Sequence, residues 1–258
     1  MSGIAGIVRF DGETVRRRDL ERVVNAMRVH GPDRSGVMVA GAVGFAHVLM
    51  RMTPEDQFDS QPCRGSTGAL ITADLRLDNR EDLLRDLGVS AGEALAWPDS
   101  RVVLSSWEKF GDAIWAKLRG PFAVAIFDPR SSTLVLARDH LGLNTVMWHK
   151  SERFFAFATM PKGLFAMADV PREVCLEKLA DFIVLNHADH ATTVYRNIFR
   201  VPPAHVASIG VKGSVSKCCF LDVLAKSIRH WLVSPDFSIA QFAVFVRFAC
   251  PVVAFDWN

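Results

Sequence analysis

The chain of 258 residues lacks most features that mark secreted, metal-binding or nucleic-acid-binding proteins. Its five cysteines include no CxxC pair, which argues against a disulfide framework or a zinc site and favours a reducing cytoplasm. Lys and Arg number 30 against 28 Asp and Glu, so no basic excess points to nucleic acid or to a membrane surface. The first residues show no basic segment followed by a long apolar run, so we expect no signal peptide.

An uninterrupted membrane span is also missing. Residues 238–255 are long enough to cross a bilayer, but Gln241, Arg247 and Pro251 interrupt them, so we expect no transmembrane helix. The surrounding segment is unusual in composition. Residues 218–258 hold 6 charged residues in 41, whereas residues 1–217 hold 52 in 217. A change in the character of the chain is therefore expected near residue 217.

What the chain does have is enough apolar sequence for a sizeable core. Half of its residues are hydrophobic, and its length suits one large domain or one domain with an appendage. Apolar periodicity and turn dipeptides predict helices over residues 19–29, 79–84, 99–110 and 176–185. They predict strands over residues 4–10, 40–50, 67–75, 122–128, 133–138, 153–159 and 204–209, with hairpins at Asp11-Gly12, at 129–132 and at 213–214. This order predicts packed antiparallel sheets with helices outside.

Five motifs occur in an order that resembles one family. They are the N-terminal MxGIAGIV, the GPD at 31–33, the Asp99-Ser100 pair at a predicted helix start, the GPFAVAIFD at 120–128 and the LARDHLG at 136–142. The set resembles the N-terminal class II glutamine amidotransferase domain of the asparagine synthetase family, over roughly residues 1–210. The VPPAH at 201–205 further resembles the LPPGH at the start of that family's second domain.

The resemblance implies the α+β fold of the N-terminal nucleophile hydrolases, a four-layer α/β/β/α sandwich of antiparallel sheets. It implies an amidotransferase-like domain over residues 1–170. Residues 171–216 would then be a linker and the start of a synthetase-type domain. Residues 217–258 would be an atypical apolar tail, where we expect the chain to be truncated or read out of frame.

The resemblance also implies a reaction. The family hydrolyses glutamine with an N-terminal Cys and passes ammonia through a tunnel to an ATP-dependent synthetase domain. The ATP site carries SGGxDS, and neither a Ser-Gly-Gly nor a GxxxxGK[ST] occurs in this sequence. We therefore expect no cofactor in this chain, with ATP and Mg bound only by a synthetase module outside it.

The nucleophile position differs from the family pattern. Ser2 stands where the family has Cys, and removal of Met1 would give it a free α-amine. An N-terminal amine has a pKa of about 7.7–8.0 and can act as base to its own side chain. A hydroxyl is nevertheless far harder to ionise than a thiol, so a site tuned for Cys does not automatically work with Ser.

The positions that should hold glutamine are also changed. Asp74 and Leu75 stand at the Asn and Gly of the oxyanion hole, and ionised Asp74 would oppose the developing negative charge. Arg76 replaces a Glu that helps hold substrate, and Leu49 replaces the Arg that grips the glutamine carboxylate. The Arg before Gly-Pro-Asp is His30, and only Asp99, at the Asp that grips the substrate amine, is retained.

Three functions remain open at this point. The chain is the N-terminal part of an asparagine synthetase-like enzyme without glutaminase activity, a non-catalytic scaffold for a separate synthetase-type chain, or an N-terminal Ser amidohydrolase. The stretch 73–80 resembles family members that close peptide or lactam rings, as in lasso-peptide maturation, where the substrate supplies the amine. The substrate is therefore glutamine or a peptide.

Other candidates have ordinary structural explanations. His47 lies in an apolar strand and is predicted to be a core residue. His187, Asp189 and His190 do not have a standard metal-ligand spacing and are predicted to form a solvated loop, so no metal site is expected. Cys63 and Cys175 are predicted to pack as small apolar side chains.

Overall fold

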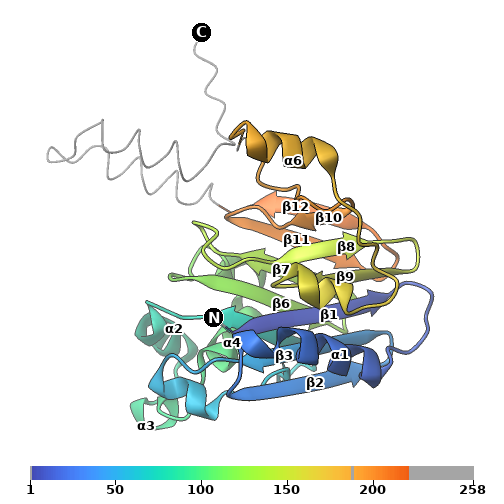
Figure 1. The fold of residues 1–258 in the computed structure, drawn as a ribbon. Helices are drawn as coiled ribbons and strands as arrows, with labels where there is room; N and C mark the ends of the chain where they lie inside the picture. The colour runs from blue at the N-terminus through green and yellow to red at the C-terminus, as the bar shows by residue number, and fades with distance from the viewer. Residues whose placement is uncertain (1, 187–188, 221–258) are drawn as a thin grey trace, which may run out of the picture.

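A computed structural model describes residues 2–186 and 189–220, which form a sandwich of two six-stranded antiparallel sheets (Figure 1). The strands of the first sheet, in spatial order, are β10 (Ile198–Arg200), β8 (Met147–Lys150), β9 (Phe154–Ala158), β1 (Gly3–Arg9), β3 (Val43–Leu49) and β2 (Arg34–Ala40). Those of the second are β12 (Val215–Cys219), β11 (His205–Gly210), β7 (Thr133–Arg138), β6 (Phe122–Asp128), β5 (Leu70–Leu75) and β4 (Cys63–Arg64).

The middle of the molecule is an apolar layer between the two sheets. Side chains alternate along a strand, so every second residue faces the opposite sheet. Ile4 and Val8 of β1 and Phe45 of β3 pack in this way against Ala123 and Phe127 of β6. These side chains are at most 8% exposed. Burial on this scale is the main force that holds the sheets together.

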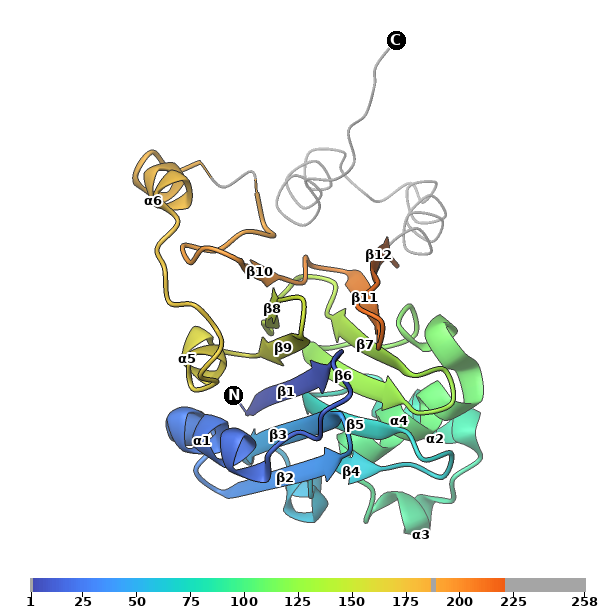
Figure 2. The ribbon, with the colours of Figure 1, turned by 90° about the vertical axis from the view of Figure 1, so that its right-hand side faces the viewer.

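Helices cover both outer faces (Figure 2). On the first sheet lie α1 (Arg17–Met27) and α5 (Pro161–Phe165), and on the second lie α2 (Arg80–Leu87) and α4 (Asp99–Phe110). The short elements are α3 (Ala91–Ala94), η1 (Arg28–His30), η2 (Pro54–Phe58) and η3 (Gly111–Ile114), and α6 (Leu176–Ile183) buries none of its residues. The predicted four-layer α/β/β/α sandwich is confirmed.

Several predicted helices and strands match the structure closely, but the hairpin predicted at Asp11-Gly12 is wrong. The helix over 99–110 and the hairpin formed by β6 and β7 have the predicted bounds. The strand predicted over 4–10 exists as β1, but Asp11-Gly12 does not close a hairpin. The next element is α1, and β1 pairs instead with β3 and β9. Local turn signals could not reveal this, because both partners are distant in sequence.

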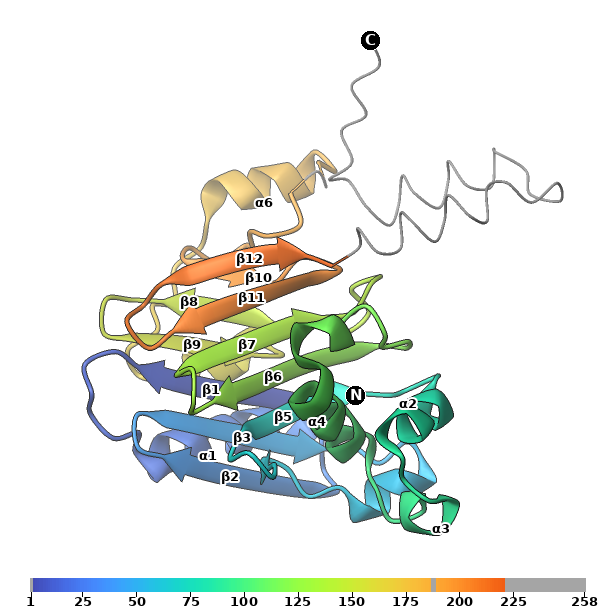
Figure 3. The same cartoon turned by 180° about the vertical axis from the view of Figure 1, so that it is seen from behind.

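The sandwich continues beyond residue 170. Strand β10 pairs with β8 at the edge of the first sheet, and β11 and β12 extend the second sheet from β7 (Figure 3). The segment predicted as a linker and the start of a second domain thus contributes strands to both sheets. The predicted apolar tail overlaps β12 only at residues 217–219, and most of it, from 221 to 258, lies outside the described residues.

Across residues 2–186 and 189–220, no helix has both the length and the apolar character needed to cross a bilayer. The interrupted apolar stretch at 238–255 lies outside this part of the chain.

Candidate functional site

One cavity of about 140 Å³ collects six of the positions singled out from the resemblance, and His30 is not among its lining residues. It is lined by Ser2, Leu49, Asp74, Leu75, Arg76 and Asp99. The antiparallel pairing of Gly3 with Val48 brings the start of β1 to the end of β3. The end of β5 reaches the same place in the facing sheet, where the ring Nε2 of His47 hydrogen-bonds the Ala73 carbonyl at 3.2 Å. The topology therefore assembles a site from residues nearly a hundred positions apart.

Ser2 is held by the backbone at the end of β3. Its Oγ accepts a hydrogen bond from the Met50 N–H at 3.0 Å and lies 3.4 Å from the Met50 carbonyl oxygen, to which it can donate. The residue is 8% exposed. The hydroxyl thus sits in the cavity wall with its backbone partner already in place.

Asp74 is the least satisfied side chain of the site. It is 7% exposed, and its Oδ2 has no hydrogen-bond partner among the described residues. Burial raises the pKa of Asp74 to about 7, against the opposite effects of the positive charge at the N-terminus and of the Ser2 backbone amide. Its own carbonyl accepts a hydrogen bond from Asn144 Nδ2 at 2.7 Å, which fixes the end of β5. A buried and partly unsatisfied carboxyl group thus lies at the position where the resemblance predicts an oxyanion-hole amide.

The remaining substituted positions offer no grip for a carboxylate. Leu49 is 3% exposed and apolar. The Arg76 guanidinium pairs with Asp78 at 3.0 Å, and both side chains are more than half exposed. Among the described residues that line the cavity, four carboxyl side chains face one guanidinium; the carboxyls are those of Asp56, Asp59, Asp74 and Asp99. The charge of the cavity is therefore opposite to what an anionic group requires.

Asp99, the one retained position, is already paired. At the start of α4 its Oδ1 accepts from Arg80 Nη1 at 2.5 Å and its Oδ2 from the Leu77 N–H at 2.8 Å. Arg80 also donates to the carbonyls of Ala94, at 3.0 Å, and Trp97. Burial raises the pKa of Asp99, while Leu77 and Arg80 counteract this effect. Both oxygens of this carboxylate are engaged before any substrate amine arrives.

A hydrogen-bond network in the wall of the cavity was not predicted from the sequence. Asp59 accepts from Ser100 Oγ and from Gln61 Nε2, both at 2.7 Å. Gln61 also accepts the Ala73 N–H at 2.5 Å, which ties the network to β5. Burial raises the pKa of Asp59. The partners are 2 to 41 residues apart, and no local motif links them, so only the fold reveals the set.

The other sequence candidates lie away from this chemistry. His47 is 2% exposed in β3, as predicted for a core residue, and burial lowers its pKa to about 4. Burial raises the pKa of half-buried Cys63 to about 11, and the Cys175 thiol donates to Glu177 at 3.3 Å. His187 lies outside the described residues, and Asp189 accepts the Ala191 N–H at 2.7 Å. Within the described residues no group of three His, Cys, Asp or Glu side chains could hold a metal ion.

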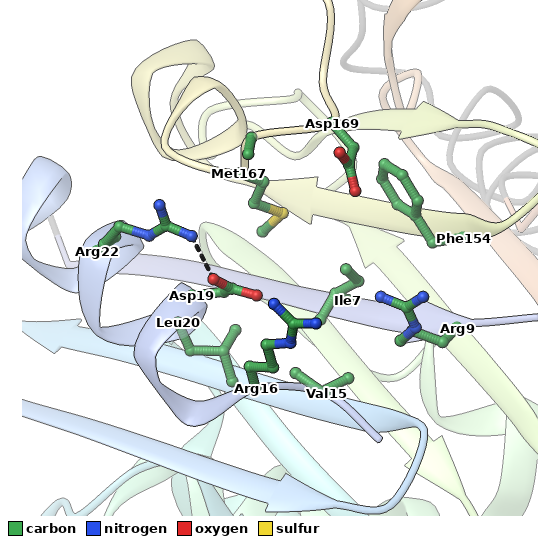
Figure 4. A pocket seen from close by; sticks show the side chains of 11 residues that line it. Ile7, Arg9, Val15, Arg16, Asp19, Leu20, Arg22, Phe154, Met167 and Asp169 are labelled. Carbon is green, nitrogen blue, oxygen red and sulfur yellow. Dashed lines mark hydrogen bonds and ion pairs between the residues drawn. The ribbon is translucent and has the colours of Figure 1, made fainter. Parts of the chain in front are cut away.

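Two further pockets lie apart from the predicted residues. A cavity of about 50 Å³ lies between β1, the start of α1 and the turn at 167–169, where Arg22 pairs with Asp19 and Arg16 lies near that carboxylate (Figure 4). A wider groove of about 660 Å³ runs between η2, α2 and α3 and includes Arg80. Arg80 in this groove is the residue that forms the ion pair with Asp99.

A family model described as a glutamine amidotransferase domain matches residues 1–218. The chain belongs to this glutamine amidotransferase family. The amidotransferase domain is 27% identical over 218 residues to asparagine synthetase (glutamine-hydrolyzing) 3 of Bacillus subtilis, covering 83% of this chain and 35% of that protein. It is 23% identical over 219 residues to a putative asparagine synthetase (glutamine-hydrolyzing) 2 of Methanocaldococcus jannaschii, and 24% identical over 190 residues to the amidase chyE of Penicillium rubens. The chain thus spans about a third of these relatives.

The solved structures agree on the fold. Glutamine phosphoribosylpyrophosphate amidotransferase from Bacillus subtilis superposes with a TM-score of 0.59 at 15% identity, over 84% of this chain and 49% of that one. The amidotransferase domain therefore has the N-terminal nucleophile hydrolase fold, and the predicted resemblance to the asparagine synthetases is confirmed over the first 218 residues.

Proposed function

We propose that this domain belongs to an asparagine synthetase-like, ATP-dependent amide-forming protein and that it no longer hydrolyses glutamine. The observation that carries the proposal is the cavity itself. It gathers the positions that the resemblance assigns to catalysis and substrate binding, yet Leu49 and Asp74 stand where the family has the carboxylate-binding Arg and the oxyanion-hole Asn. The carboxylate of free glutamine would enter a space with four carboxyl groups and no unpaired cation among the described lining residues.

These two substitutions weaken both the binding of glutamine and the stabilisation of the transition state for its hydrolysis. Burying a carboxylate without a partner is strongly unfavourable, so Leu49 removes the main grip on the substrate. Loss of one oxyanion donor costs about 2.7–4 kcal/mol of transition-state stabilisation, and an ionised Asp74 adds repulsion. The sum is enough to suppress turnover even where Ser2 is well placed.

The amide-forming chemistry belongs to a partner module in this proposal. The relatives extend well beyond the matched region, and we place ATP, Mg and the activated acid on a synthetase-type domain or chain outside these 258 residues. The stretch Ala73–Arg80 favours the peptide- or lactam-cyclising branch, in which the amine is part of the substrate. In this proposal the amide-forming reaction takes place in the cytoplasm. An SGGxDS motif in the adjacent coding DNA, in frame or in another frame, supports this placement, and its absence from that DNA contradicts it.

The decisive experiment measures glutamate release from glutamine by the chain starting at Ser2, with Ser2→Cys alongside. We expect no turnover by either protein. The positive control is the variant that restores the family pattern at positions 2, 49, 74, 75 and 76, which should gain measurable activity if the rest of the cavity is intact. Turnover by the wild-type chain that Ser2→Ala abolishes would overturn the proposal.

One observation supports an N-terminal Ser amidohydrolase as the second candidate. A buried carboxyl group that keeps its proton donates a hydrogen bond, and the raised pKa of Asp74 leaves a large protonated fraction near pH 7. Such an enzyme would have a bell-shaped pH profile with its maximum between about pH 7 and 8, because Asp74 must be protonated to stabilise the oxyanion while the Ser2 amine must be neutral to act as the base. A pH profile of glutamate release with that shape would identify it.

A further inference from the structure

Ser2 and Asp74 form a pair whose chemistry changes when the first residue is removed. The backbone amide of Ser2 acts on the Asp74 carboxylate, and both residues line the same cavity. The Ser2 hydroxyl interacts with the Met50 backbone. The group of Ser2 that acts on Asp74 is therefore its backbone nitrogen. In the unprocessed chain this nitrogen is an amide with one hydrogen and no charge.

The partner of this nitrogen is an unsatisfied acid. Asp74 Oδ2 has no hydrogen-bond partner in the described part of the chain, and the side chain is 93% buried. A buried carboxylate without a charged partner is destabilising, whereas one that meets an ammonium group is compensated. The cavity therefore contains a place for one positive charge beside Ser2.

We propose that Asp74 binds the α-ammonium group of Ser2 after an aminopeptidase removes Met1. Hydrolysis of the Met1–Ser2 peptide bond uses one water, which adds OH to the methionine carbonyl and H to the Ser2 nitrogen. A further proton from solvent completes an ammonium group with three donors. One of these donors hydrogen-bonds Asp74 Oδ2, the carboxylate oxygen that the amide leaves without a partner. Asp74, which stands at the oxyanion-hole Asn position, then binds the N-terminus of the chain.

The pair has a chemical consequence for the site. An ammonium held by a buried carboxylate keeps its proton to a higher pH than a free N-terminus, whose pKa is about 7.7–8.0. The amine then cannot accept the Ser2 hydroxyl proton near neutral pH, which is the step that an N-terminal nucleophile needs. The other ionisable side chains around the cavity are Asp56 and Asp59 near η2, Arg76 after β5 and Asp99 on α4, and His47 lies behind it in β3. The carboxyl groups of Asp56, Asp59 and Asp99 act on the amine in the same direction as Asp74, and the positive charge of Arg76 is paired with Asp78.

The test uses the full chain cut from an N-terminal fusion so that Ser2 is first, confirmed by mass spectrometry. Competitive acetylation with acetic anhydride, followed by mass spectrometry of the N-terminal peptide, gives the titration of the Ser2 amine. At pH 8 we expect the wild-type amine to react about tenfold more slowly than the amine of Asp74→Asn. Asp78→Asn, which removes an exposed carboxylate from the same segment, should behave as the wild type. Equal reactivity of the wild-type and Asp74→Asn amines would overturn the proposal.

A second measurement does not depend on the folding of Asp74→Asn. The wild-type chain is prepared with either Ser2 or Met1 as its first residue, and thermal unfolding is compared at pH 8. We expect the Ser2-first chain to unfold at the higher temperature, because only in that chain is the ammonium group on the Ser2 nitrogen, where it donates directly to Asp74, whereas the N-terminal charge of the Met1-first chain acts on Asp74 from one residue further away. A Met1-first chain of equal or greater Tm would contradict the pair. Amine reactivity and glutamate release are separate readouts, so this inference and the proposed function fail independently.

Discussion

Asp99 and Arg80 form a buried ion pair at the edge of the candidate site. Their ion pair is 10–15% exposed at the side chains and joins the start of α4 to α2. The Arg76–Asp78 pair, which lies just before Arg80 in the sequence, has the same chemistry, but both of its side chains are more than half exposed. The two pairs therefore separate the effect of burial from the effect of charge.

Replacing Asp99 by Ala should cost about 3 kcal/mol or more of unfolding free energy, because the buried Arg80 guanidinium keeps only carbonyl partners and loses its counter-charge. Replacing Asp78 by Ala should cost less than about 0.5 kcal/mol, since exposed pairs contribute little. Urea denaturation followed by circular dichroism measures both. A similar loss in the two variants would show that Arg80 finds other partners.

His47 makes the stability depend on pH. Its pKa is about 4 in the folded chain, below an unfolded value of about 6.5, so the unfolded chain binds the extra proton. The stabilising effect of neutral His47 is complete above pH 6.5 and is lost as the pH falls toward 4. We expect the wild type to lose about 2 kcal/mol relative to His47→Gln between pH 7 and pH 5. Parallel pH profiles of the two proteins in urea melts would contradict this assignment.

At the scale of elements, the loop before β6 is fixed by a close backbone approach. Gly120 has φ of +109°, and a Cβ there would lie 2.2 Å from the Arg76 carbonyl oxygen. The neighbouring Pro121 carbonyl accepts the Arg76 N–H at 3.0 Å, so this contact sets the backbone just after Asp74 and Leu75. The glycine thus positions one wall of the cavity.

Gly120→Ala should destabilise the fold by about 2 kcal/mol or more, because both the φ angle and the overlap oppose a side chain. Gly12 offers the matched control, with φ of +76° and open space around the added carbon. Gly12→Ala should cost about 1 kcal/mol, the ordinary penalty of a left-handed residue. Thermal unfolding compares the two, and equal losses would mean that the loop at 120 yields easily.

At the scale of the whole molecule, the sandwich needs its last strands. Without residues 198–219, β7 and β8 would each lose a neighbouring strand, and Ile198, Val201 and Ile209 would leave the core. Unpaired edges with exposed apolar surface promote aggregation. We expect a chain of residues 1–220 to unfold cooperatively as a monomer, whereas residues 1–170 should aggregate. Size-exclusion chromatography and thermal unfolding test this, and a monomeric, cooperative 1–170 fragment would instead favour a domain boundary at 170.

Much of the fold could be predicted from local pattern, and the failures have two causes, distant strand partners and short strands. The helix over 99–110 and the hairpin of β6 and β7 depend on contacts close in sequence, so periodicity and turn residues were sufficient. The hairpin expected at Asp11-Gly12 was wrong because β1 is central and both its neighbours come from elsewhere in the chain. Strand β10 has three residues, too few for a periodic pattern.

The sequence by itself determined the family, the two-sheet sandwich and the side chains of the candidate site, because ordered motifs and apolar alternation are local properties. Only the tertiary structure decided what those side chains do. It paired Asp99 with Arg80, turned Arg76 toward Asp78 and buried Asp74 beside Ser2. Burial and long-range pairing set the charge state of an acidic side chain, and the residues next to it in the sequence determine neither.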